Sequence, residues 1–506
     1  MLIKTVAYIR HRWLGRLSTL FALLFGLALI CCFSTGLPLV FANQLNTAQK
    51  LAYAAPKGLA GGAGTAKQQL FSSYLTPHST LPQANRPDFF AGQALAKQPW
   101  VKAPTTTTAR DGLGPLYNAR TCLACHANGG RGKLPEDATT PLFNSFVRIS
   151  LPGKHATDGA IFDPNYGDQL QTQSVSLYHQ LGLAHDPKSP EPPAEARVTV
   201  HWQDIPFTYP DGTIRTLRKP QLDIDKLAYG ALPKNIQTSL RNAPPLTGVG
   251  LLEAIEQSAI NALADEHDNN GDGISGRINW VWEAEQKKRL PGRFGLKANR
   301  HNLRQVTALA FANDIGITNP AAPNQPCTAQ QSTCIASPHG NDEEGVELAE
   351  HLLQLVTNFS RNLAVPQQRP LATATLNKGQ QHFHQLGCAS CHQPDFITAS
   401  NAVLPHLSQQ HIWPYSDLLL HDMGPGLADN RPDFDASGQE WRTAPLWGVG
   451  LSKAANGSNH LLHDGRARGV EEAILWHGGE AQAAKEKFAA LPKLEREYLI
   501  QFVEAL

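Results

Sequence analysis

The sequence predicts a mainly α protein with two related modules, the first enlarged by an insertion that holds small β elements. The motif C-x-x-C-H occurs twice, at residues 122–126 and 388–392. A string ending in Gly-Val-Gly-Leu follows each motif, beginning at Arg241 and at Arg442. The motifs lie 266 residues apart and the strings about 200, so the first module carries about 66 additional residues. Apolar residues at helical spacing before the second motif and at the end of the chain support the helical part of the prediction.

The composition excludes several classes of protein. The chain has 506 residues, which is enough for more than one hydrophobic core. Its 44 Lys and Arg balance 43 Asp and Glu without a basic stripe, so we expect no nucleic-acid partner. A mean hydropathy of −0.30, with 41 Gly and 36 Pro, is typical of a loop-rich globular protein and not of one that crosses a membrane repeatedly.

Residues 1–42 are typical of a signal peptide. Four basic residues and no acidic residue accompany an apolar stretch over residues 17–33, and Val40-Phe41-Ala42 offers a cleavage site. The alternative is an uncleaved segment that serves as a single membrane anchor. In both cases we expect the rest of the chain to lie in the periplasm, with membrane contact only if the segment is uncleaved. Residues 43–105, rich in Ala, Gly, Gln, Pro and Thr, predict an extended lead-in with no core of its own.

The eight cysteines divide into three groups. Two of them leave with the signal peptide, and four belong to the C-x-x-C-H motifs. Cys327 and Cys334 remain, in a polar loop. We expect these two to form a local disulfide in an oxidising compartment, with free thiols as the alternative.

C-x-x-C-H is the attachment motif of c-type haem. Two thiols at this spacing add to the two vinyl groups of haem, and the adjacent His reaches the iron. A zinc site or a thioredoxin-type redox pair would not require His at the same offset each time. The sequence therefore predicts two covalently bound haems c, on Cys122 and Cys125 with axial His126, and on Cys388 and Cys391 with axial His392.

The motifs set the expected domains. We place a haem domain with insertions at residues 106–343 and a cytochrome c-like domain at 344–506. In the second domain, residues 376–386 predict a helix with Gly379 on its contact face, and Leu494 to Phe502 predict a final helix that crosses it.

Two segments between the motifs have patterns of their own. Residues 344–363 predict an amphipathic helix that links or covers the modules. The alternating residues 198–202, after the Pro-rich segment 185–194, predict a small β element within the insertion.

The second ligand of each iron decides what each haem can do. Met423 is the sole methionine after the initiator and lies in a Gly- and Pro-containing turn, which favours an axial ligand. His477 is the rival candidate, and His463 is a weaker one. No ligand stands out for the first haem, because no histidine of its insertion occupies such a turn. The weak candidates there are His155, His179, His185 and His201, and an open iron is the alternative.

Residues 268–273 resemble the first half of a calcium loop. Asp268, Asn270 and Asp272 place oxygen ligands at alternate positions before a Gly. Asn279 stands where an EF-hand has its bidentate Glu. We therefore expect calcium without an EF-hand, and an Asx-rich turn is the alternative.

Many separated blocks of the sequence resemble the bacterial di-haem oxidoreductase family, often labelled thiol oxidoreductases. That family is related to di-haem cytochrome c peroxidases and to MauG-type enzymes. Besides the motifs and strings, the resemblance rests on residues 111–115, 166–170, 272–277, 292–295, 418–426, 463–468 and 476–479. It implies a peroxidatic first haem, a higher-potential second haem that receives electrons, and a calcium between the modules. It also places His477 where peroxidases have the distal Met of the second haem. The thiol oxidoreductase label gains no support, because both C-x-x-C pairs are assigned to haem.

The resemblance implies stepwise electron transfer from a small cytochrome c or copper protein, through the haem at His392, to the haem at His126, where peroxide is cleaved. Peroxide cleavage requires a proton acceptor near the open face. Glu253, directly after the first string, is our candidate for that acceptor. The alternatives are a di-haem electron carrier without a substrate of its own, a redox partner in iron handling, and an enzyme that oxidises protein side chains.

Overall fold

A computed structural model describes residues 58–66, 73–107, 110–401 and 403–506 of the chain. They belong to one compact unit that runs from Tyr53 to Leu506. The expected signal peptide and residues 43–57 of the lead-in lie outside the described residues. No helix in the described part is long and apolar enough to cross a membrane.

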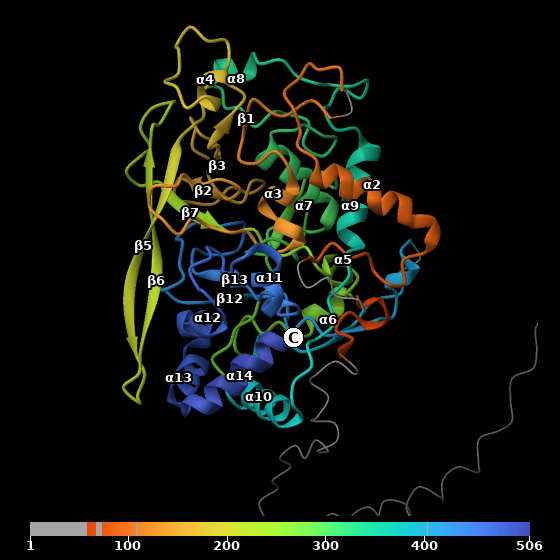
Figure 1. The fold of residues 1–506 in the computed structure, drawn as a ribbon, viewed down its shortest axis with the longest axis vertical. Coiled ribbons are helices and arrows are strands. Elements are labelled where there is room, and N and C mark those ends of the chain that lie inside the picture. Colours follow the sequence, from red (N-terminus) through yellow and green to blue (C-terminus); the bar gives the residue numbers. More distant parts are fainter. Residues whose placement is uncertain (1–57, 67–72, 108–109, 402) are drawn as a thin grey trace, which may run out of the picture. The chain divides into compact units, whose positions relative to one another are not determined.

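The protein is about 29% helix and 18% strand, so the mainly α prediction fits only loosely. Most of the strand lies in one long hairpin and in several sheets of two or three short strands. The longer helices are α2 (Arg86–Lys97), α7 (Leu303–Ala310), α9 (Glu350–Arg361), α10 (Thr373–Gln385), α12 (Val470–Trp476), α13 (Gln482–Ala490) and α14 (Lys493–Ala505) (Figure 1).

Two pairs of helices pack closely by the same device. In α2, a Cβ at Gly92 would lie 2.2 Å from the carbonyl oxygen of Leu355 in α9. In α10, a Cβ at Gly379 would lie 2.4 Å from the carbonyl oxygen of Tyr498 in α14. Both contacts require glycine because the neighbouring backbone occupies the space of a side chain. The close contact between α10 and α14 agrees with the crossing of helices expected there.

Helices α2 and α9 differ from the sequence-based expectations. Residues 86–97 were expected to be extended, but they form α2, because Phe89 and Ala96 share a buried face with Gly92. The amphipathic helix expected at residues 344–363 begins at Glu350 and packs against α2. α2 and α9 therefore form a helix pair ahead of the second motif.

The repeated strings also repeat in conformation. Gly248 and Gly448 both have a φ of 69°, and each begins a short helix, α5 (Val249–Glu253) or η8 (Val449–Leu451). The amide of Gly248 donates to Leu363 just after α9, and the amide of Gly448 donates to Leu506 just after α14. Each string is therefore anchored at the end of the second helix of a pair.

The insertion forms a long antiparallel hairpin, β5 (Arg197–Thr208) with β6 (Ile214–Asp225). This confirms the β element predicted around residues 198–202 and shows that it is longer than expected. At the hairpin tip, the Tyr209 hydroxyl donates to Glu471 of α12 at 2.9 Å. Arg496 of α14 donates to Asp211 at 2.8 Å, so the tip reaches the helices of the second module (Figure 1).

The other sheets are small. A three-stranded sheet has the order β3 (Gln169–Leu170), β2 (Phe146–Ser150), β7 (Gln237–Arg241). The two-stranded sheets pair β1 (Leu116–Tyr117) with β4 (Gln173–Ser174), β8 (Trp280–Glu283) with β9 (Lys288–Pro291), β10 (Phe396–Ile397) with β11 (His411–Ile412), and β12 (Leu420–Asp422) with β13 (Glu440–Arg442). Cys327 and Cys334 form the expected disulfide, and Cys334 lies in α8 (Ser332–Ile335).

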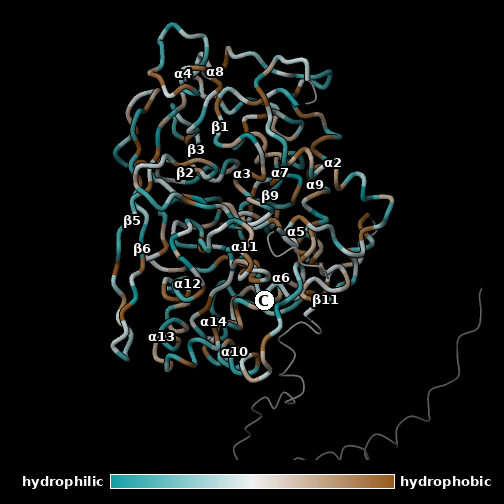
Figure 2. Tube along the Cα trace, viewed as in Figure 1, coloured by the Kyte–Doolittle hydropathy of each residue, from teal (hydrophilic) through white to brown (hydrophobic). Residues whose placement is uncertain are grey.

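The core is divided between several clusters of buried side chains. The largest gathers around α10 and α14 and includes Phe383, Tyr415 and Phe502. The second surrounds α2, α7 and α9 and includes Phe89 and Phe359. Figure 2 shows hydrophobic residues spread through both regions and interleaved with hydrophilic ones.

Candidate functional sites at the two C-x-x-C-H motifs

The first motif occupies a short helix, α3 (Cys122–Cys125). Thr121 is its N-cap, and its hydroxyl accepts a hydrogen bond from the amide of Ala124 at 2.9 Å. Such a cap stabilises a helix end by about 1 kcal/mol. The cap holds Cys122 and Cys125 one turn apart and places His126 at the end of the helix.

His126 is oriented by a backbone carbonyl. Its Nδ1 lies 2.7 Å from the carbonyl oxygen of Pro244 in the first string, so Nδ1 carries the proton and donates it. Burial lowers the pKa of His126 to about 4, although this hydrogen bond opposes the shift. The imidazole is therefore neutral at pH 7 with Nε2 as its base, which is the form that binds a metal.

The second motif has the same arrangement on a different support. Cys388 begins a 3-10 turn, η6 (Cys388–Ser390), and His392 Nδ1 donates to the carbonyl oxygen of Tyr415 at 2.8 Å. Burial again lowers the pKa of the histidine to about 4. Tyr415 has a φ of 54°, a conformation that is costly for a bulky residue. This backbone strain turns its carbonyl toward His392.

The four motif cysteines are free thiols in this structure. Burial raises the pKa of Cys122 and of Cys388 to about 12, so both are protonated at neutral pH. Among the described residues, no group of three or more His, Cys, Asp or Glu is arranged to hold a metal ion.

A cavity of about 290 Å³ adjoins the first motif. Cys122, Cys125 and His126 line it, and so do residues 241–247 of the first string and several residues of 442–447 in the second. Both repeated strings therefore border the same motif, which the sequence did not predict.

The cavity wall carries an excess of positive charge. Its charged side chains are Arg131, Arg148, Arg241, Arg300, Arg442, Asp314 and Asp433. Arg148 pairs with Asp168, outside the cavity. Within the described part of the chain, Arg131, Arg300 and Arg442 form no ion pair. Burial lowers the pKa of each of these three, to about 10 for Arg442.

Unpaired buried guanidinium groups are costly unless a ligand supplies negative charge. Arg131 is only 7% exposed and lines the cavity. Haem carries two propionate carboxylates, so its charge complements the arginines of this wall. The residues present therefore fit a haem attached at the first motif.

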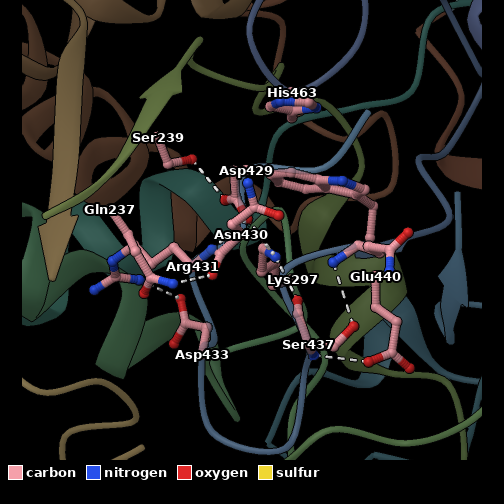
Figure 3. A network of polar contacts seen from close by, with 12 residues as sticks. Gln237, Ser239, Lys297, Asp429, Asn430, Arg431, Asp433, Ser437, Glu440 and His463 are labelled. Atoms are coloured by element: carbon pink, nitrogen blue, oxygen red, sulfur yellow. Dashed lines mark hydrogen bonds and ion pairs between the residues drawn. The ribbon is translucent and has the colours of Figure 1, made fainter. Parts of the chain in front are cut away.

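Arg241 is held on the cavity wall by a hydrogen bond to a buried polar network, whose members include Ser239, Lys297 and Asp429 (Figure 3). Its Nη2 donates to Asp429 Oδ2 at 2.9 Å, and Ser239 donates to the same carboxylate oxygen at 2.7 Å. The fully buried Lys297 donates to Asp429 Oδ1 at 3.0 Å and to the Ser437 carbonyl at 2.6 Å. Asp429 thus pairs with both Arg241 and Lys297, whereas Arg131 has no ion pair among the described residues.

Asp314 is an acidic side chain of the cavity wall that acts electrostatically on the first motif. Burial raises its pKa, although the hydrogen bond from Gln169 at 2.8 Å opposes the shift. Its charge also raises the pKa of Cys122 and of Cys125. Asp314 lies in a π-helical turn, η5 (Phe311–Ile315), a conformation that is frequent at functional sites. Asp314 could not be found from the sequence, because nothing in the sequence pattern marks a π turn.

Glu253, the proton acceptor expected from the sequence, is not among the residues that line the cavity. Its Oε2 accepts from Arg361 of α9 at 2.6 Å, and its Oε1 accepts from the amide of Leu303 at the start of α7 at 2.8 Å. Both oxygens are thus committed to joining helices. A role of Glu253 as the proton acceptor stays a prediction.

His477 and Met423 lie on two turns that pack together. His477 follows directly after α12, and its Nδ1 donates to the Ala473 carbonyl at 2.6 Å. A positive charge on His477 would lower the pKa of His392. A Cβ at Gly478 would lie 3.0 Å from the carbonyl oxygen of Met423. The structure therefore places both distal candidates in the same region.

The other histidine candidates lie elsewhere. His463 stacks on Trp441, with ring centroids 3.7 Å apart, and Asp429 of the network in Figure 3 acts on its charge. None of the four weak candidates for the first haem lines the cavity; these are His155, His179, His185 and His201.

The expected calcium loop is an Asx-rich turn in this structure. Asp268 accepts from the amide of Gly273, and Asn270 accepts from the amide of Asp272. Asp272 in turn accepts from the amide of Ile274 at 2.9 Å. These oxygens accept hydrogen bonds from the backbone of the loop. Calcium binding stays a prediction without structural support.

Each motif holds a histidine that is oriented by a backbone carbonyl and preceded by a pair of thiols, and a charged cavity adjoins the first motif. The chain belongs to the family described as "Di-haem oxidoreductase, putative peroxidase", whose model matches residues 57–506. A comparison with curated proteins finds no similar sequence.

Proposed function

We propose that this chain is an exported oxidoreductase that carries two covalently attached haems c and reduces a peroxide. The observation that carries the proposal is the pair of motif histidines, both held neutral with Nε2 as the base. The first site is a charged cavity. The second is surrounded by the aromatic core around α10 and α14. The signal-like residues 1–42 support export, because c-type haem is attached outside the bacterial cytoplasm.

Attachment is a balanced addition. Each cysteine S–H adds across a vinyl double bond, so the sulfur bonds to one carbon, the proton goes to the other, and no oxidant is needed. His126 and His392 then supply Nε2 to the iron. When bound, haem iron supplies one-electron transfer and, where a coordination position is open, a binding site for peroxide.

The asymmetry of the two sites assigns their roles. At the second motif His477 is the candidate for the opposite ligand, because its Nδ1 donates to the Ala473 carbonyl and leaves Nε2 as the base. A haem with both positions filled suits electron entry from a small cytochrome c or copper protein. The first site, with its cavity, suits the peroxide.

Asp314 takes the role first given to Glu253. Reduction of a peroxide ROOH to ROH and H₂O consumes two electrons and two protons. Burial raises the pKa of the Asp314 carboxyl, so an Oδ atom of this carboxyl can accept a proton from a bound peroxide and then return that proton. The neighbouring Gln169 holds one of its oxygens, which leaves the other for this exchange.

A peroxide-turnover assay with reduced cytochrome c as the donor tests the proposal. We expect hydrogen peroxide to oxidise the donor, and Asp314→Asn to lower the rate by about 100-fold or more while both haems stay attached. Asp223→Asn, in β6, is the control. Fully loaded protein that leaves donor and peroxide unchanged would favour the electron-carrier alternative.

A further inference from the structure

A continuous chain of hydrogen bonds joins the second motif to the turn that carries His477. The carbonyl oxygen of Cys391 accepts from the amide of Asp417 at 3.0 Å. Asp417 Oδ2 accepts from His421 Nε2 at 2.8 Å, and His421 Nδ1 donates to Glu480 Oε2 at 2.7 Å. Glu480 lies three residues after His477. The chain of hydrogen bonds therefore connects the second motif to the turn that follows His477.

His421 is the centre of this chain. Both of its ring nitrogens lie within hydrogen-bond distance of carboxylates, which accept hydrogen bonds. Hydrogen bonds between ions are shorter and roughly twice as strong as those between neutral groups. The side chains of His421 and Asp417 are each only 3% exposed. His421 also lies 3.7 Å from Cys391 Sγ, so the chain touches the attachment point itself.

The Glu480 carboxylate ties together three segments. Besides His421, it accepts from the amide of Ser275 at 3.1 Å, from the Ser275 hydroxyl at 2.9 Å and from the amide of Asp422 at 3.1 Å. Ser275 follows the Asx-rich loop, and Asp422 ends β12. One side chain therefore fixes the turn after His477 against a strand and a loop from distant parts of the sequence.

The backbone contacts of the same turn leave it little freedom. Gly479 has a φ of 53°, and a Cβ there would lie 2.3 Å from the carbonyl oxygen of Asp422. Gly424 has a φ of 71°, and a Cβ there would lie 2.7 Å from the amide nitrogen of Gly479. The two turns touch through their backbones, so the position of His477 depends on what holds the turns together.

We propose that Asp417, His421 and Glu480 form a brace that sets the position of His477 relative to His392 and so keeps the second haem ligated on both sides. The inference rests on the proposed function, because it takes the second motif to carry haem and His477 to be its distal ligand. Buried ion networks contribute little net stability, since desolvation offsets their attraction. A role in positioning explains why three charged side chains are placed here.

The test compares optical and electron paramagnetic resonance spectra of the ferric holoprotein, with midpoint potentials of both haems, in the variants Glu480→Ala and Glu480→Gln. His477→Ala serves as the reference for loss of the ligand. The matched control is Glu472→Gln in α12, which breaks the ion pair between Glu472 and Arg468. Thermal unfolding shows whether each variant is folded.

We expect Glu480→Ala to convert the second haem from low spin to the high-spin form of His477→Ala and to lower its midpoint potential, with the first haem unchanged. Glu480→Gln should give a mixture, because its amide oxygen still accepts from Ser275 and Asp422. If Glu480→Ala does not fold, Ser275→Ala should still raise the high-spin fraction.

A folded Glu480→Ala with unchanged low-spin signal and potential, while His477→Ala loses both, would overturn the brace alone. If His477→Ala itself leaves the second haem unchanged, the ligand assignment in the proposed function is wrong and the brace falls with it. In that case Met423→Ala identifies the ligand.

Discussion

Replacing Arg131 by Met should weaken the first haem site in two measurable ways. The guanidinium lines the cavity, is 7% exposed and forms no ion pair among the described residues. Met has a similar length and no charge, so the change removes one buried positive charge without opening a large void. We expect the holoprotein to lose about 1.5 to 3 kcal/mol of stability, the value of a hydrogen bond to a charged group, because a haem propionate loses its partner.

The midpoint potential of the first haem should fall in the same variant. A nearby positive charge favours the ferrous form, which carries one charge less than the ferric form, so its removal favours the ferric form. Thermal unfolding and a redox titration measure the two effects. Arg289→Met is the control, because Arg289 pairs with Asp435 at a half-exposed position away from the cavity. An Arg131 variant as stable as the wild type, with an unchanged midpoint, would refute the assignment of the unpaired arginines to haem.

Two further predictions concern the fold and its pH dependence. Gly379→Ala should destabilise the holoprotein by about 1 to 3 kcal/mol in urea unfolding, because the new Cβ meets Tyr498 and Phe502 at 2.4 Å; an equally stable variant would contradict the close packing of α10 on α14. Glu195 is buried, and burial raises its pKa to about 8 despite hydrogen bonds from Gln171 and Gln331. Because the pKa of Glu195 is higher in the folded than in the unfolded state, its contribution to the free energy of unfolding is fully present below about pH 4.5. As the pH rises through 8, the protein loses up to about 5 kcal/mol of that stability. Glu195→Gln should therefore unfold at a higher temperature than the wild type at pH 9 and not at pH 4, and equal differences at both pH values would contradict this.

Features set by local spacing could be predicted from the sequence. The thiol pairs and histidines of both motifs, the Cys327–Cys334 disulfide and the strand around residues 198–202 each depend on a few neighbouring residues. The repeat of the two strings was visible for the same reason. Its structural meaning, a left-handed glycine anchored at the end of a helix, needed the partners at Leu363 and Leu506.

Features set by distant segments could not be predicted. Glu253 was correctly placed after the first string, but the direction of its side chain is decided by Arg361 and the start of α7. Asp314 enters the cavity through a π turn that leaves no periodic trace. The unpaired arginines converge from segments far apart in the sequence.

The most direct test of the account is a redox titration of the holoprotein followed by optical spectroscopy, with peroxide added to the half-reduced form. The account predicts two separated midpoints, the higher one belonging to a six-coordinate haem at His392, and a spectral reaction with peroxide confined to the haem at His126. Two matched midpoints, six-coordinate spectra for both haems throughout and no reaction with peroxide would contradict it.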